Sequence, residues 1–181
     1  MKWNEVKGTL GIMGCVLAVM ATGGGAAFFY ANTLVEWWLP LVVALCAALL
    51  FWVLMKGAWA RWWPGAYGWL RCVAHFAIFA PLAAFVLLGA NYAGADDATL
   101  HGERVEVERK YREKHYRNRR VGRNRYVKGE PYYTYKVEVR FADGRLKTLD
   151  YPLERYNCVR QGAPLTLEME AGLLGWPVIR R

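Results

Sequence analysis

The chain has 181 residues, of which 55% are hydrophobic, and it carries a formal net charge of +9. That length suits one ordinary domain. Three stretches without Asp, Glu, Lys or Arg nevertheless exclude a simple soluble protein, because each approaches the roughly 20 apolar residues that a helix needs to cross a bilayer. We predict an α+β membrane protein with a helical region at residues 1–95, spans at about 9–31, 37–55 and 72–95, and a small β-domain at 96–181.

The first span is rich in small residues. Gly11 with Cys15, Gly14 with Ala18 and Ala21 with Gly25 have the four-residue spacing that lets helix backbones approach closely in lipid. We expect a packed helix that binds a protein partner or a second copy of the chain. A loose helix is the alternative, because such spacings are common in membrane spans. A cleavable signal peptide fits less well, because the apolar stretch is long for one.

The short loops predict the orientation. Lys56, Arg61 and Arg71 lie between the second and third spans with no acidic residue, which is typical of a cytoplasmic loop. The N-terminus is then cytoplasmic, and three crossings place 96–181 on the outer, periplasmic side of a bacterial inner membrane. Five basic residues within 104–114 argue for the opposite orientation, but long domains cross largely regardless of their charge.

Aromatic residues crowd the ends of the spans. We interpret six tryptophans as membrane-interface anchors, because amphipathic rings prefer the headgroup level: Trp37, Trp38, Trp59, Trp62, Trp63 and Trp69. An aromatic cage for a cationic ligand is the sharper alternative.

Polar chemistry is sparse inside the spans. His75 is the one ionisable candidate at membrane depth, and a packing or interfacial role explains it more simply than a proton relay. Pro40 and Pro81 each remove a backbone hydrogen bond and predict kinks.

The composition changes at Asp96, beyond which lie 19 of the 24 Lys and Arg residues. Hydrophobic residues then alternate in the manner of strands, most clearly where one face holds Tyr133, Tyr135, Val137, Val139 and Phe141 and, later, where another holds Leu165, Leu167 and Met169. Asp143-Gly144 predicts a tight hairpin turn with two positive-φ residues. A helical turn is expected at 152–157. About five short strands predict a small sheet or partly open barrel.

Several patterns in this half occur together: Gly102-Glu-Arg-Val-Glu-Val, Tyr132-Tyr133 ahead of Val137-Glu-Val-Arg-Phe-Ala-Asp-Gly, Val159-Arg-Gln-Gly, Leu165-Thr-Leu, and Gly172-Leu-Leu-Gly-Trp-Pro-Val-Ile. With them the region resembles an uncharacterised class of bacterial membrane proteins, in which a few N-terminal helices precede a small β-domain of unknown function. The resemblance implies a fold and no particular activity.

A basic hairpin arm at 109–128 is the most distinctive polar segment. It contains one acidic residue, Glu113, and ten basic ones that we predict to bind an anionic partner: Arg109, Lys110, Arg112, Lys114, Arg117, Arg119, Arg120, Arg123, Arg125 and Lys128. Membrane lipids, anionic envelope polymers and an acidic protein fit this charge. Nucleic acid also fits, but is not expected outside the cell. A solvated hairpin without a partner is the alternative.

Catalytic and metal-binding patterns are missing from the sequence. The four cysteines show no metal-ligand spacing, and we expect Cys158 to be buried and inert. The chain contains no serine, and its histidines are not near an obvious nucleophile. We therefore expect a non-enzymatic protein without a cofactor, acting as an accessory subunit of a larger assembly. A membrane immunity protein that neutralises a toxin, and an unrecognised enzyme or transporter component, are the alternatives.

Overall fold

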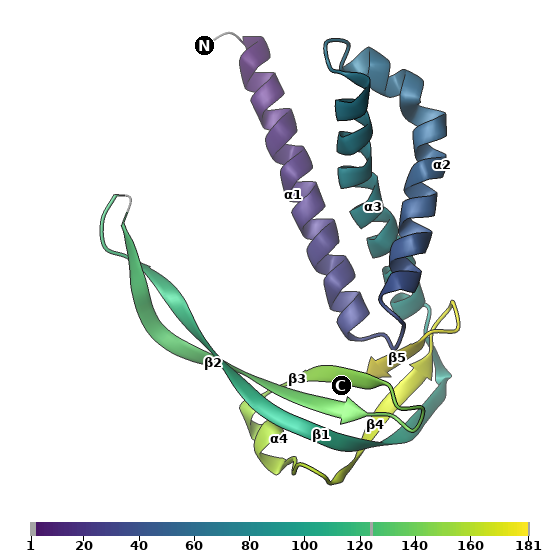
Figure 1. The fold of residues 1–181 in the computed structure, drawn as a ribbon, viewed down its shortest axis with the longest axis vertical. Coiled ribbons are helices and arrows are strands. Elements are labelled where there is room, and N and C mark those ends of the chain that lie inside the picture. Colours follow the sequence, from purple (N-terminus) through teal and green to yellow (C-terminus); the bar gives the residue numbers. More distant parts are fainter. Residues whose placement is uncertain (1–2, 124, 181) are drawn as a thin grey trace. The chain divides into compact units, whose positions relative to one another are not determined.

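The computed structural model describes residues 3–123 and 125–180, with side chains from Met13 onward. It confirms the predicted layout of three long helices followed by a five-stranded antiparallel sheet (Figure 1). The elements are α1 (Trp3–Ala31), α2 (Trp38–Trp62), α3 (Gly68–Ala93), β1 (Asp96–Arg120), β2 (Tyr126–Arg140), β3 (Leu146–Tyr151), α4 (Leu153–Cys158), β4 (Pro164–Ala171) and β5 (Pro177–Arg180).

The strand order is β3-β2-β1-β4-β5, an open sheet rather than a barrel. Two compact units divide the chain. The first comprises the residues up to Leu100, which include the three long helices, together with Met169–Arg180. The second comprises His101–Glu168. The unit that holds the helices therefore also includes β5, the start of β1 and the end of β4.

All three helices are long and apolar enough to cross a membrane. The loop expected between Lys56 and Arg71 is shorter than predicted, because α2 continues to Trp62 and α3 begins at Gly68. Lys and Arg are good helix formers and do not end a helix by their charge. Pro64 ends α2, because the residue before a proline, here Trp63, is disfavoured in the helical conformation.

The helices α1 and α3 pack through two glycines that each face an aromatic ring. A Cβ atom on Gly25 would overlap the ring of Phe85, and one on Gly89 would come within 3.1 Å of Phe29. A Cβ on Gly14 would meet nothing within 4 Å. The small-residue face of α1 is thus closely packed at Gly25 and open at Gly14.

The two prolines have different effects. Pro40 is the third residue of α2, where backbone N–H groups have no acceptor within the helix, so the predicted loss of a hydrogen bond there was wrong. Pro81 lies inside α3 and leaves one carbonyl oxygen of the preceding turn without its helical donor.

The segment after α1 pairs with the C-terminal strand. Leu34 N donates to Pro177 O over 2.8 Å, and Ile179 N donates to Asn32 O over 2.8 Å. Thr33 and Val178 form an antiparallel bridge between these two bonds. The α1–α2 connection therefore covers an edge of β5.

The core of the second unit has the predicted strand faces. Val137, Val139 and Phe141 are buried, as is Leu167 in β4, whereas Tyr133 of the same predicted face is exposed because it lies beyond the third strand. The β2–β3 turn differs from prediction, since Gly144 has a φ of 84° and no described residue other than glycine has a positive φ. The bond from Phe141 N to Arg145 O encloses a three-residue loop, which needs only one left-handed residue.

Candidate functional site

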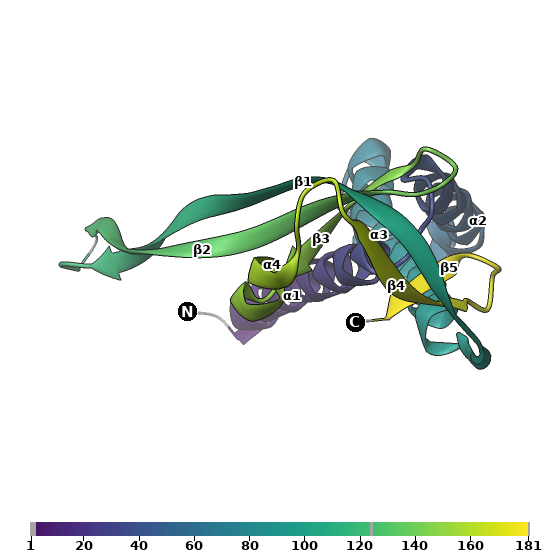
Figure 2. The same ribbon diagram turned by 90° about the horizontal axis from the view of Figure 1, so that it is seen from below.

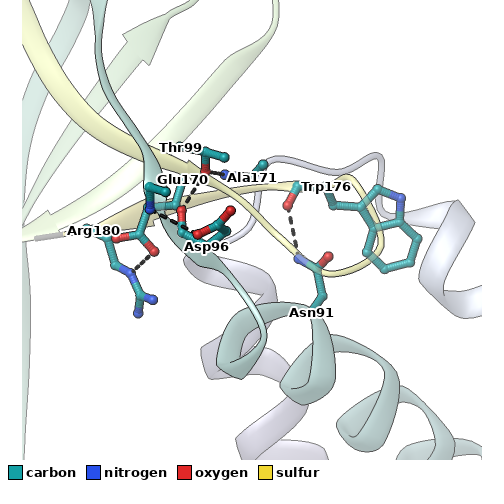
Figure 3. A network of polar contacts seen from close by, with 8 residues as sticks. Asn91, Asp96, Thr99, Glu170, Ala171, Trp176 and Arg180 are labelled. Atoms are coloured by element: carbon teal, nitrogen blue, oxygen red, sulfur yellow. Dashed lines mark hydrogen bonds and ion pairs between the residues drawn. The ribbon is translucent and has the colours of Figure 1, made fainter.

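A polar cluster joins the end of α3 to the β4–β5 hairpin within the first unit (Figure 3). Asn91 Nδ2 donates to Trp176 O over 3.0 Å, and Asn91 Oδ1 accepts from Leu174 N over 2.9 Å. Asn91 is fully buried, so its amide replaces water for two backbone groups of the turn. Gly172 is required beside it, because a Cβ there would overlap the Asn91 amide.

An ion pair lies near this cluster. Arg180 Nε donates to Glu170 Oε2 over 2.7 Å, and the Glu170 residue is only 5% exposed. The Arg180 guanidinium also lies 4.8 Å from the ring centroid of Tyr92 in α3. The hydrogen bond to Glu170 raises the pKa of Arg180, which keeps this guanidinium charged. These contacts hold the hairpin in place.

His75 is fully buried and lies between α2 and α3. Its Nδ1 accepts a hydrogen bond from Trp59 Nε1 over 2.9 Å, and Nε2 lies 2.9 Å from Ala48 O. An indole nitrogen can only donate, so Nδ1 is the acceptor and the ring proton is on Nε2, which donates to Ala48. The ring also stacks on Phe79 with centroids 4.3 Å apart. These contacts are those of a packing residue with both nitrogens satisfied.

The predicted basic arm is the continuation of β1 and β2. The two strands pair from Glu106 opposite Arg140 to Arg120 opposite Tyr126, whereas β3 pairs with β2 only as far as Tyr135. Beyond Tyr135 the hairpin has two strands, which Figure 2 shows as a twisted ribbon. This two-stranded part, 113–134, has seven Lys and Arg residues and two acidic ones.

Tyrosine rings separate the cations along the arm. Lys114 and Lys128 each place an ammonium group 5.2 Å from the ring centroid of Tyr116, and the Arg112 guanidinium lies 5.0 Å from that of Tyr133. The ring faces attract these cations and so order the exposed side chains of the arm. A hydrogen bond with Tyr116 raises the pKa of Lys114, which keeps this ammonium charged.

The opposite face of the arm is mixed in charge. His115 stacks on Tyr132 at 5.2 Å, and its Nε2 lies 3.0 Å from Thr134 Oγ1. Glu113 pairs with Lys136 over 3.2 Å and raises the pKa of that lysine. Because strand residues alternate between faces, the face with Arg112, Lys114 and Lys128 is the more positive one.

A bulge shapes the middle of the arm. The register shifts between Tyr116 and Asn118, so that Gly129 and Glu130 lie opposite Arg117 alone. A Cβ on Gly129 would come within 2.8 Å of Arg117 O, so only glycine fits without a shift of the backbone. Bulges increase the local twist of a strand pair, in agreement with the twisted pair of strands β1 and β2 in Figure 2.

Two of the ten predicted binding residues have structural contacts with backbone carbonyls. Lys110 Nζ donates to Tyr156 O over 2.9 Å and to Val159 O over 2.8 Å, and so holds the end of α4. Arg120 donates to Gly122 O over 2.9 Å and to Arg123 O over 2.6 Å, and closes the tip of the arm.

The other eight predicted binding residues are exposed along the arm: Arg109, Arg112, Lys114, Arg117, Arg119, Arg123, Arg125 and Lys128. Residue type and spacing identified this group, but the role of Lys110 depends on tertiary contacts and that of Arg120 on the local conformation of the tip. The anionic partner stays a prediction.

Five of the six predicted anchors expose their indole rings, namely Trp37, Trp38, Trp62, Trp63 and Trp69. Trp59 differs, because its N–H donates to His75 and its ring meets those of Trp62 and His75 edge to face. Trp59 thus has a packing contact that the sequence pattern did not indicate.

Cys158 is exposed, so the expectation that it is buried was wrong. It lies at the end of the six-residue helix α4, and its Sγ donates to Glu154 O over 3.4 Å.

Among the described residues, no group of three His, Cys, Asp or Glu side chains is placed to hold a metal ion. No family model, curated protein or solved structure matches the chain.

Proposed function

We propose that the protein is a non-enzymatic, multi-pass membrane protein whose basic arm binds an anionic partner. The two-stranded arm carries the proposal: cations and tyrosines cover a ribbon that reaches beyond the three-stranded part of the sheet. An isolated two-stranded hairpin is marginally stable in water. The cation–tyrosine contacts and the Gly129 bulge give this one a defined surface, which a merely solubilising charge run would not need.

We further propose that the arm lies outside the cytoplasm. The turn between α2 and α3 is flanked by Lys56, Arg61 and Arg71, which favour the cytoplasmic side. Supporting this, β5 pairs with Asn32–Leu34, so the C-terminal strand lies at the same end of the helices as the α1–α2 connection. Protease added to intact bacterial spheroplasts is expected to cut the β-domain, and full protection would reverse the orientation.

Binding is tested with the full chain in phosphatidylcholine nanodiscs and inorganic polyphosphate as the probe. The variant R117S/R119S/K128S removes three exposed arm cations, and R104S/R155S/R160S removes three exposed cations elsewhere in the second unit. At about 1 kcal/mol for each cation at low salt, we expect the arm variant to bind about 100-fold more weakly. The control should stay within about twofold. Equal losses in both variants would show general charge attraction and contradict a binding site on the arm.

A further inference from the structure

The tip of the arm has exposed hydrophobic side chains among its cations. Val121 is 63% exposed, Tyr126 64% and Val127 48%. We propose that the anionic partner is a lipid bilayer surface and that these three side chains enter its headgroup region. This inference rests on the proposed function of the arm and specifies its partner.

The pairing at the tip places each apolar group beside an arginine. Val127 lies opposite Arg119, and Tyr126 lies opposite Arg120. Directly opposed residues of an antiparallel pair share a face, so both faces of the tip combine an apolar side chain with a guanidinium group. Bilayer binding has the same two requirements, apolar burial at the acyl boundary and cations for the lipid phosphates. A soluble polyanion would use only the cations.

The backbone of the tip is also suited to an environment with little water. Val121 N donates to Arg125 O over 2.9 Å, and the Arg120 guanidinium occupies the carbonyl oxygens of Gly122 and Arg123. An unpaired carbonyl that leaves water costs several kcal/mol at bilayer depth. Arg120 therefore satisfies in advance the groups that insertion would dehydrate.

The tip lies at the end of a long two-stranded ribbon. Glu113 to Arg120 spans eight residues of two-stranded ribbon, about 26 Å at the usual rise of a strand. Helix α3, the last predicted membrane span, also ends at Ala93, only a few residues before β1 begins. A bilayer partner is thus present at high effective concentration, and an individually weak contact is sufficient.

The first experiment compares two double variants of the full chain in phosphatidylcholine nanodiscs. V121N/V127N removes two of the three apolar side chains of the tip, and L146N/L153N removes two exposed leucines elsewhere in the second unit. Each is mixed with vesicles of phosphatidylcholine containing 30% phosphatidylglycerol, with dihexanoyl-phosphatidylglycerol below its micelle concentration, and with polyphosphate. We expect V121N/V127N to bind the vesicles at least tenfold more weakly and polyphosphate equally well, and L146N/L153N to change neither.

The outcomes separate the two proposals. If V121N/V127N binds the vesicles as tightly as the unaltered chain, tip insertion is wrong and the anion-binding function stands. If the unaltered chain binds dihexanoyl-phosphatidylglycerol as tightly as the vesicles, the site recognises a phosphate group and not a surface. If the unaltered chain binds neither vesicles nor polyphosphate, both proposals fail.

A second measurement uses the unaltered chain and so does not depend on the folding of a variant. Amide hydrogen exchange across 119–127 should slow at least tenfold with phosphatidylglycerol vesicles and stay unchanged with phosphatidylcholine vesicles or polyphosphate. Equal protection by polyphosphate, or none with any probe, would overturn tip insertion.

Discussion

Gly129 lies against the backbone of Arg117, and a Cβ atom at Gly129 would come within 2.8 Å of the Arg117 carbonyl oxygen. This close approach sets the bulge at Arg117, beyond which the outer part of the arm, 118–128, extends to the tip. No third strand pairs with the outer part, so its register depends on contacts of this kind. The shape of the proposed binding surface therefore depends on one glycine.

Gly129→Ala is expected to unfold the outer arm. Overpacking of this type costs about 1–3 kcal/mol, which is enough to open a marginally stable hairpin. Hydrogen exchange within 113–134 should accelerate, while exchange in 137–141 stays slow. Gly122→Ala is the matched control, since its Cβ would have a nearest contact of 3.9 Å. Equal exchange in the two variants would mean that Gly129 does not determine the register.

Asn91→Ala should loosen the C-terminal hairpin. It removes one of the two donors to the Trp176 carbonyl, which keeps the Gly172 N–H, and it leaves the Leu174 N–H without its acceptor, a loss of about 1–3 kcal/mol. Limited proteolysis in mild detergent should then cut at 172–176 faster than in the unaltered chain. Asn157→Ala, at an exposed position in α4, serves as the control. Identical cleavage rates would show that Asn91 does not hold this turn.

Trp59→Phe should destabilise the α2–α3 pair by roughly 1 kcal/mol, the scale of one side-chain hydrogen bond in a membrane. The variant keeps an aromatic ring and removes the donor to His75 Nδ1. Thermal unfolding in detergent measures the effect, with Trp69→Phe as the control because that ring is exposed. If both variants melt alike, Trp59 is an interface anchor only.

The β2–β3 turn should weaken only in acid. Hydrogen bonds from the Arg145 side chain and backbone lower the pKa of Asp143 below 3.8. A lowered folded-state pKa contributes stability that is present above about pH 4 and lost as the pH falls through the folded value. The pair is exposed, so the effect is a few tenths of a kcal/mol. The protection factor of the Gly144 amide, which is its intrinsic exchange rate divided by its measured rate at the same pH, should fall below pH 4 in the unaltered chain and show no such fall in Asp143→Asn.

Local patterns were sufficient to predict much of the fold. The alternation of Val137, Val139 and Phe141 identified the buried face of β2, and the apolar stretches identified the helices. The predicted α2–α3 loop is too long, because the prediction ended the helices at charged residues. In the structure Pro64 ends α2. The two-residue turn at Asp143-Gly144 was predicted from a dipeptide, but the observed turn depends on the register of both strands.

Contacts between distant segments could not be read from the sequence. The pairing of Leu34 with Pro177, and the Asn91 amide between two turn residues, join segments whose proximity no local pattern encodes. Composition identified the ten cations of the arm, but not that Lys110 holds α4 from a distant segment. The role of Arg120 is local, but it depends on the conformation of the tip, which composition does not specify.

The most direct test of the account removes the arm and keeps the sheet. Arg112 pairs with Tyr135, and Tyr135 is the last residue of β2 toward the arm that also pairs with β3. An Asn-Gly turn can therefore join Arg112 to Tyr135 as a two-residue hairpin loop. This shortened chain, in phosphatidylcholine nanodiscs, is compared with the full chain for polyphosphate affinity, with exchange protection at 137–141 as the check on folding. We expect at least a 100-fold loss of affinity with protection unchanged. Undiminished affinity in a folded shortened chain would contradict the arm as the binding element.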